Sequence, residues 1–252
     1  MSPTLLQDDI DSMLTSVFDD ADAPVYVVNP SDESISALVS TLEDHSSPPE
    51  VRVLADEGTL KTVMDDFLVA STAADLVDAG DLSMRLLDAT PNHSVAVTGD
   101  SVYALVTIGD AVGGLGTDDA EFVGDAADYY ESAWENAETY SLRTPAISRV
   151  RSTLESDIGD ETADDFDSVL GSLSTARGDG DGLDEVTISL LVAARNNELL
   201  YDISKWGEDV GLASKATFSR TKTKLEDMGL IDTEKVPIDV GRPRLRLMLG
   251  DD

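Results

Sequence analysis

The sequence predicts an α/β domain with a central sheet and flanking helices, followed by a smaller helical domain that ends in a hairpin. Three observations support this prediction. Helix and strand patterns alternate through the first 108 residues, a glycine- and aspartate-rich tract lies at 178–182, and two short amphipathic helices precede two short strands in the last fifth. Alternation of this kind is typical of one sheet covered by helices.

The first domain contains most of the expected elements. We expect helices over 4–19, 31–42, 57–77, 118–140, 145–156 and 162–175, and strands over 24–28, 51–55, 82–87, 94–97 and 102–108. The turn sequence Thr98-Gly-Asp-Ser101 predicts that the last two strands form a hairpin. Because it contains Gly113, Gly114 and Gly116, the stretch 109–117 is interpreted as a flexible loop.

The glycine-rich tract is the predicted boundary. The expected division is an acidic α/β domain over 1–177 for effector binding or dimerisation, a linker over 178–183 and a second domain over 184–252. Residues 1–183 hold 7 basic and 38 acidic residues, whereas 212–249 hold 8 and 5, a local net charge of +3. A basic surface in so acidic a chain indicates an anionic partner, and nucleic acid is the favoured one.

Composition restricts the class of protein. The chain has 252 residues, 17 basic and 51 acidic, with a net charge of −34 spread among apolar residues. Dense like charge costs little where salt shortens the Debye length to about 3 Å, so we expect a halophilic, archaeal origin. There is no cysteine, hence no disulfide or thiolate metal site. No apolar run of 18 residues is present, so we expect a cytoplasmic protein without a membrane span.

The last fifth predicts a helix–turn–helix. A helix over 200–210 presents Ile203, Trp206 and Val210, with Trp206 interpreted as core. Gly211 makes the turn, and Ser214 is the expected N-cap of a helix over 215–228. Phe218, Thr221, Leu225 and Met228 share one arc of that helix, and Ala216, Ser219, Arg220 and Thr223 lie opposite.

Strands expected over 230–236 and 245–249 flank Pro237-Ile-Asp-Val-Gly-Arg-Pro-Arg244, a candidate wing. This order of elements resembles the winged helix–turn–helix of prokaryotic transcriptional regulators, on Gly211, Phe218, Arg220, Leu225 and the terminal Gly229-Leu-Ile. The whole chain resembles the TbsP-type regulators of haloarchaea. That resemblance implies a transcriptional regulator of metabolic genes, with double-stranded promoter DNA as its partner.

In such a domain the second helix enters the major groove. The expected DNA-binding residues are Ser214, Lys215, Thr217, Ser219, Arg220, Lys222, Thr223, Lys224, Arg242 and Arg244. Arg220 is expected to pair with guanine, Lys222 and Lys224 to touch phosphates, and Arg242 to enter the minor groove or clamp the backbone. Counterion-driven affinity falls with salt, so we also expect a homodimer.

No enzymatic motif is complete, and no catalytic residue, metal or cofactor is expected. The first domain loosely resembles the effector domain of TrmB-type regulators, related to phospholipase-D-like domains, but His93 lacks the His-x-Lys pattern. His45 and His93 are interpreted as surface residues, as are the acidic pairs Asp65–Asp66 and Asp164–Asp165. The stretch 179–184 begins like a calcium loop but is interpreted as linker.

Two functions from different classes remain open. The first is a sequence-specific transcription factor whose amino-terminal domain dimerises or senses a small metabolite. The second is a protein-interaction module whose winged helix docks another transcription factor without base contacts. The helix over 118–140 is a candidate dimer seam, and packing of that helix on its own sheet is the alternative.

Overall fold

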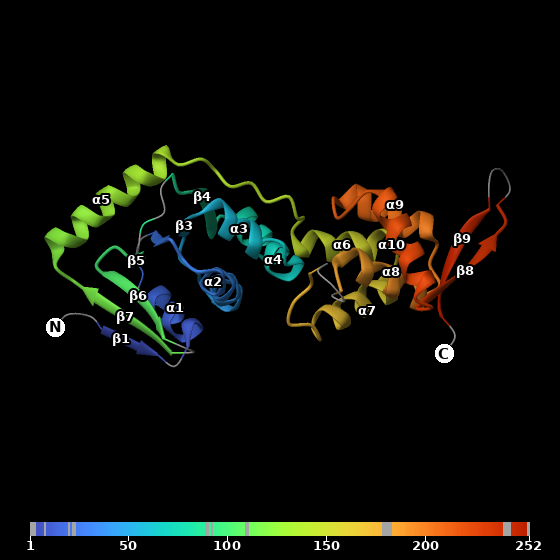
Figure 1. Cartoon of the computed structure of the whole chain (residues 1–252), viewed down its shortest axis with the longest axis horizontal. Coiled ribbons are helices and arrows are strands. Elements are labelled where there is room, and N and C mark those ends of the chain that lie inside the picture. The colour runs from blue at the N-terminus through green and yellow to red at the C-terminus, as the bar shows by residue number, and fades with distance from the viewer. Residues whose placement is uncertain are drawn as a thin grey trace. The chain divides into compact units, whose positions relative to one another are not determined.

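The computed structural model describes residues 4–7, 9–19, 21, 24–88, 91, 93–108, 111–177, 183–238 and 243–250. The chain forms two compact units, coloured from blue to red along the sequence in Figure 1. Unit 1 comprises Met1–Asp65 and Thr72–Leu142, and unit 2 comprises Asp66–Ser71 and Arg143–Asp252. None of the helices in the described residues is long and apolar enough to cross a membrane.

Unit 1 is built on a mixed sheet, as the sequence predicts for the first domain. In spatial order its strands are β1 (Thr4–Gln7), β7 (Ala111–Thr117), β6 (Val102–Ile108), β5 (Ser94–Val97), β2 (Val25–Val28), β3 (Val51–Ala55) and β4 (Leu82–Leu86). β2, β3 and β4 are parallel, and the other neighbours are antiparallel. The parallel strands are joined by α2 (Asp32–Asp44), α3 (Glu57–Val63) and α4 (Phe67–Ala79).

Helices cover both faces of this sheet. Figure 1 shows α5 (Ala120–Asn136) on one side, and α1 (Ile10–Asp19) and α2 on the other. The α5 side buries Val28, Leu54 and Val97 against Val123 and Trp134. Trp134 lies beneath two cations of the sheet, with Arg85 4.7 Å and Arg52 5.8 Å from its ring centroid. The expected helix over 118–140 therefore packs on its own sheet, the alternative to a dimer seam.

Two segments of unit 1 differ from the sequence-based expectation. Thr4–Gln7 forms strand β1, where a helix was expected from residue 4. Ala111–Thr117 forms strand β7, where a flexible loop was expected. β7 pairs with β6 on one side and β1 on the other, so both edges of its backbone are hydrogen-bonded. This pairing overrides the weak strand preference of glycine.

The expected helix over 57–77 is two helices, α3 and α4, separated at Met64–Asp66. Asp66 explains the break and is buried, so its interpretation as a surface residue is wrong. Its carboxylate accepts hydrogen bonds from the backbone N–H groups of Leu68 at 3.0 Å and Ala176 at 3.1 Å. Arg177 Nε lies 3.3 Å from its second oxygen. Asp65, by contrast, is exposed.

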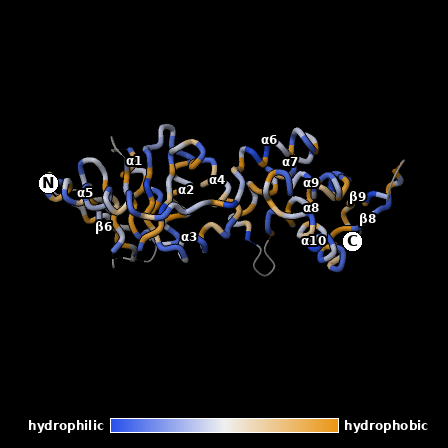
Figure 2. Tube along the Cα trace, turned by 90° about the horizontal axis from the view of Figure 1, so that it is seen from above, coloured by the Kyte–Doolittle hydropathy of each residue, from blue (hydrophilic) through white to orange (hydrophobic). Residues whose placement is uncertain are grey.

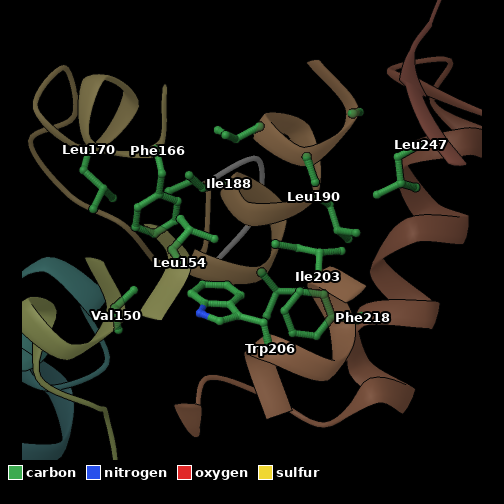
Figure 3. Packing of buried hydrophobic residues seen from close by; sticks show 14 of the residues in the cluster. Val150, Leu154, Phe166, Leu170, Ile188, Leu190, Ile203, Trp206, Phe218 and Leu247 are labelled. Carbon is green, nitrogen blue, oxygen red and sulfur yellow. The ribbon is translucent and has the colours of Figure 1, made fainter. Parts of the chain in front are cut away.

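Unit 2 is helical and ends in a two-stranded sheet. Its elements are α6 (Ile147–Asp157), α7 (Asp160–Leu170), α8 (Glu185–Arg195), α9 (Leu200–Val210), α10 (Lys215–Asp227), β8 (Ile231–Val236) and β9 (Arg244–Leu249). Figure 3 shows their shared core, in which Phe166, Trp206 and Phe218 are buried. Trp206 is 2% exposed, and its Nε1 donates to Thr153 Oγ1 at 3.0 Å, which confirms the core interpretation.

The division into units falls at Leu142/Arg143, earlier than the boundary at 178–183 that the glycine-rich tract suggests. Helices α6 and α7 bury Val150, Leu154 and Phe166 in the same cluster as α8, α9 and α10. Shared burial, and not linker composition, sets the limits of a compact unit. Hydrophobic and hydrophilic positions alternate along the helices of both units (Figure 2). Residues 178–182 lie outside the described residues.

Candidate nucleic-acid interface

Helices α9 and α10 form a helix–turn–helix with capped ends. α9 ends at Val210, and its C-cap Gly211 has a φ of 96°, a left-handed value that suits glycine. The next helix begins after Ser214, whose side chain accepts a hydrogen bond from the N–H of Thr217 at 3.2 Å. The hydroxyls of Ser214 and Thr217 are 3.0 Å apart. Ser214 therefore caps the amino-terminal end of α10, and the hydroxyls of Ser214 and Thr217 lie at that exposed end.

The faces of α10 follow the expected division, with one exception. Phe218 and Leu225 are buried, and Ala216, Ser219, Arg220, Thr223 and Lys224 are exposed. Met228 was expected on the buried arc but is 57% exposed. The helix ends at Asp227, and Met228 is its C-cap. The exposed side is mostly polar and carries one exposed carboxylate, Asp227, at its carboxyl-terminal end.

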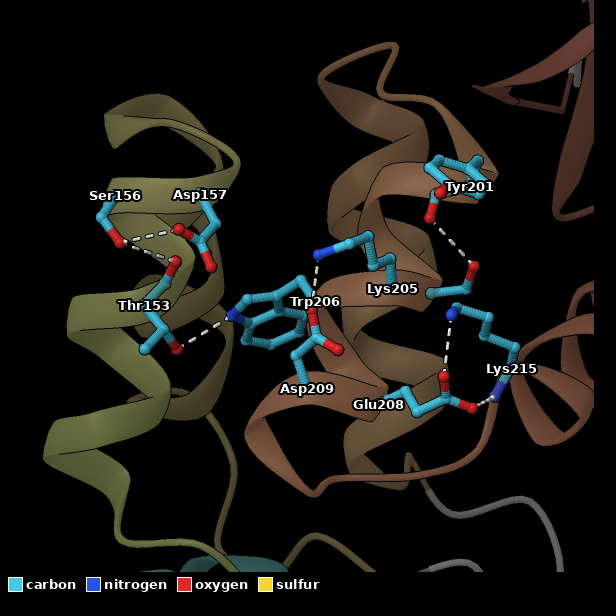
Figure 4. Close-up of polar contacts among 10 residues, drawn as sticks. Thr153, Ser156, Asp157, Tyr201, Lys205, Trp206, Glu208, Asp209 and Lys215 are labelled. Atoms are coloured by element: carbon cyan, nitrogen blue, oxygen red, sulfur yellow. Dashed lines mark hydrogen bonds and ion pairs between the residues drawn. The ribbon is translucent and has the colours of Figure 1, made fainter.

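Lys215 is held by an acidic residue of the preceding helix. Its Nζ lies 2.8 Å from Glu208 Oε2, and its backbone N–H donates to Glu208 Oε1 at 3.3 Å (Figure 4). The hydrogen bond with Glu208 raises the pKa of Lys215, and the same bond lowers the pKa of Glu208. The ammonium group is therefore charged and already paired with Glu208, so an anion that binds it competes with that carboxylate.

Lys222 faces the two-stranded sheet and not the exposed side of α10. Its side chain is 12% exposed, and its Nζ lies 2.6 Å from Glu226 Oε2. Glu226 Oε1 in turn accepts from Thr233 Oγ1 of β8 at 2.8 Å. Burial alone would raise the pKa of Glu226, but the hydrogen bonds from Lys222 and Thr233 outweigh it and the pKa is lowered. This chain of contacts fixes α10 to the base of the hairpin.

Strand β9 ties the hairpin to α9. β8 and β9 pair antiparallel from Ile231↔Leu249 to Val236↔Arg244. Leu199, which precedes α9, forms a bridge with Arg246. Arg244 Nη1 lies 3.3 Å from Asp202 Oδ1, and its guanidinium lies 4.3 Å from the ring centroid of Tyr201. Arg244, the last residue of the candidate wing, is thus positioned by the first turn of α9.

A concave surface of about 470 Å3 lies between α9, α10 and the wing. It is lined by Leu200, Tyr201, Ser204, Lys215, Ser219, Ile238, Pro243, Arg244 and Leu245. The fold brings Lys215, Ser219 and Arg244 together there, as the sequence analysis expects for a shared site. Tyr201 and Ser204 were missed. Tyr201 is 46% exposed and precedes the apolar points of its helix, a weak signal in the sequence.

Arg220 and Arg242 are also predicted to contact DNA. Arg220 is exposed, and its Nη2 lies 3.5 Å from Thr217 Oγ1. Arg242, the predicted residue at the wing tip, lies outside the described residues. Arg246, on the same strand as Arg244, lies 3.6 Å from Glu234 of β8.

Family profiles cover the chain from end to end. The profile of the TbsP-like transcriptional regulator amino-terminal domain matches residues 2–145, and that of the carboxyl-terminal helix–turn–helix domain matches residues 146–252. The chain belongs to the TbsP-like transcriptional regulators. It is a DNA-binding regulator with an α/β amino-terminal domain and a carboxyl-terminal helix–turn–helix domain. The junction of the two profiles lies beside the division between the compact units.

No curated protein matches the chain. Among solved structures, the archaeal chromatin protein TrmBL2 is 13% identical over 54% of each chain, with a TM-score of 0.38. The chain therefore spans about half the length of TrmBL2. The phospholipase D family member Nuc from Salmonella typhimurium is 11% identical, with 55% of this chain and 99% of that one covered and a TM-score of 0.37. NucT from Helicobacter pylori is 17% identical, with coverage of 56% and 99% and a TM-score of 0.40. Likenesses at this level carry no functional correspondence.

Proposed function

We propose that this regulator reads promoter DNA by placing the amino-terminal half of α10 in the major groove. Ser219, Arg220 and Thr223 are the base-reading side chains, and Lys215 and Lys224 contact phosphates. The wing, with Arg242 and Arg244, contacts the adjacent backbone or minor groove. Lys222 pairs with Glu226, which accepts a hydrogen bond from Thr233 of β8. In this proposal Lys222 therefore supports the hairpin and does not contact DNA.

Arg220 carries the proposal because of what surrounds it. Lys215, Lys222, Arg244 and Arg246 each lie within 4.0 Å of a carboxylate. Among the described residues, Arg220 has no such ion pair, and its recorded contact is with the Thr217 hydroxyl. Its fork of donors is exposed on the outer face of α10, seven residues before Asp227, the exposed acid of that face. A paired hydrogen bond to guanine O6 and N7 suits such a group and contributes roughly 1–3 kcal/mol of discrimination.

The proposal includes a homodimer, a metabolic set of target promoters in a halophilic archaeon and a small effector that acts on unit 1. Dimerisation is required because affinity from counterion release falls steeply with salt. Two half-sites related by symmetry restore affinity through hydrogen bonds and shape.

The test is Arg220→Ala, measured by fluorescence anisotropy on promoter fragments recovered by chromatin immunoprecipitation, in concentrated KCl. We expect about a 5- to 150-fold loss of affinity for the recovered site and little change for random DNA. Arg220→Lys keeps the charge but loses the fork, so it retains non-specific binding and loses discrimination.

Arg195→Ala is the matched control, since Arg195 pairs with Asp165 on the α7–α8 side of unit 2 and carries the same charge. Equal losses in Arg195→Ala and Arg220→Ala would overturn the assignment. Full promoter occupancy with Arg220→Ala, combined with loss of a protein contact, would favour the protein-interaction module instead.

A further inference from the structure

Unit 1 contains a pocket between α5 and the antiparallel half of the sheet. Its volume is about 720 Å3, within the range of small-molecule sites. The floor is formed by Val95, Val102 and Ala104 of β5 and β6, and Leu115, Gly116 and Thr117 of β7 close one side. Phe122, Asp125, Ala126, Tyr129 and Tyr130 of α5 form the other wall, with His93 at one end.

The apolar part of this pocket is open to solvent. Leu115 is 59% exposed, Phe122 55% and Tyr129 68%. Large apolar side chains that are grouped in a concave surface indicate a binding site more than scattered exposure does. The rings of Tyr129 and Tyr130 are perpendicular, with centroids 5.1 Å apart, so they present a face and an edge to an incoming ring.

The polar groups of the pocket identify the chemistry of its ligand. Among the described residues that line it, Asp125 is the one with a formal charge at neutral pH, and none is a lysine or arginine. The hydroxyl of Tyr130 lies 3.5 Å from His93 Nε2. Burial, followed by the effect of Tyr129, raises the pKa of Tyr130, so its phenol stays neutral. Aromatic faces beside a carboxylate favour a cation over an anion.

A second copy of the same face is a poorer occupant than a small molecule. The exposed side of α5 and its approach carry Asp118, Asp119, Glu121, Asp125 and Asp128, all exposed. A two-fold contact would place these acids opposite their own copies, and like charges across an interface are unfavourable. A small cationic ligand, in contrast, is attracted by the same acids.

We propose that this pocket binds a small organic amine with an apolar, ring-sized body. The body lies among Phe122, Leu115 and Tyr129, and the ammonium group points to the Asp125 carboxylate. This inference extends the effector included in the proposed function. Its first assay contains no DNA, so a failure here is distinguishable from a failure of the DNA-reading assignment.

The test compares three probes that share a phenylethyl group by isothermal titration calorimetry of the full chain at pH 8, where an alkyl amine is protonated. They are 2-phenylethylamine, 3-phenylpropionamide and 3-phenylpropionate. We expect the amine to bind about two- to fivefold tighter than the amide, as one exposed ion pair allows, and the carboxylate to bind weakest. Asp125→Asn should equalise the amine and the amide, and Phe122→Ala should weaken all three.

Asp128→Asn is the matched control, because Asp128 is exposed on the same helix but does not line the pocket. It should leave the preference for the amine unchanged. Equal effects of Asp128→Asn and Asp125→Asn would mean that the overall negative charge of α5 causes the preference for the amine. That result would overturn the proposed site. Absence of binding by all three probes at millimolar concentration would also overturn it. So would a dimer that Phe122→Ala dissociates and that binds no amine.

Discussion

Gly207 lies against the ring of Phe218, and a methyl group on Gly207 would overlap that ring. Phe218 is fully buried in the core of unit 2, so the ring cannot move aside. Gly207 belongs to the middle of α9, where glycine normally weakens a helix. The close approach of α9 and α10, and hence the orientation of the reading helix, depends on the absence of a side chain at residue 207.

Gly207→Ala should therefore destabilise unit 2, although alanine is the better helix former. We expect a loss of about 1–3 kcal/mol in the free energy of unfolding from overpacking, measured by denaturation in concentrated KCl. Gly124→Ala in α5 is the control, since a methyl group there meets nothing within 4 Å. It should gain roughly 0.5–1 kcal/mol. Stability of Gly207→Ala at or above wild type would contradict the packing.

Asp66→Ala should be destabilising far beyond what one aspartate among 36 suggests. It would leave the N–H groups of Leu68 and Ala176 without their acceptor and Arg177 without its partner. We expect a loss of about 2–4 kcal/mol, seen as a lower thermal midpoint. Asp65→Ala removes the same charge from an exposed neighbour and should change stability by less than about 0.5 kcal/mol. Comparable losses in the two variants would refute the role of Asp66.

Glu208→Gln should tighten DNA binding. Glu208 holds the Lys215 ammonium at 2.8 Å, and the loss of its charge frees Lys215 for a phosphate. We expect a few-fold higher affinity and a steeper dependence of affinity on salt, because one more counterion is released. Asp209→Asn removes the same charge one residue away, where Asp209 pairs with Lys205. If the two variants gain equally, general repulsion and not the Lys215 contact is responsible.

Glu226→Gln should show a defect that depends on pH. The pKa of Glu226 is lowered from its ordinary value of 4.5, so folding favours the carboxylate. The stabilisation it gives is present above about pH 4.5 and is lost as pH falls through the lower folded value. Wild type and variant should thus differ at pH 7 and converge in acid, as measured by chemical denaturation. Asp227→Asn, at the exposed neighbour, should change the stability at pH 7 by less than about 0.5 kcal/mol.

Within unit 1 the sequence predicted β2 to β6 and the covering helices, because each has a local pattern of apolar residues. It did not predict β1 and β7. Thr4–Gln7 follows the same apolar pattern as the helix after it, and Gly113, Gly114 and Gly116 suggest a loop. Thr4–Gln7 becomes a strand by pairing with residues about 100 positions away, as in Leu5↔Gly114, and β7 pairs with both β1 and the adjacent β6. The local pattern of apolar residues does not show which distant residues pair.

The sequence by itself determined the helix–turn–helix, because its signals are local. Gly211 permits the left-handed turn, Ser214 caps the next helix, and Phe218 and Leu225 define its buried face. Only the tertiary structure decided which cations are occupied: Lys215 by Glu208, Lys222 by Glu226 and Arg244 by Asp202. It also separated buried Asp66 from exposed Asp65. Ion pairing and burial depend on distances between elements, and composition cannot report them.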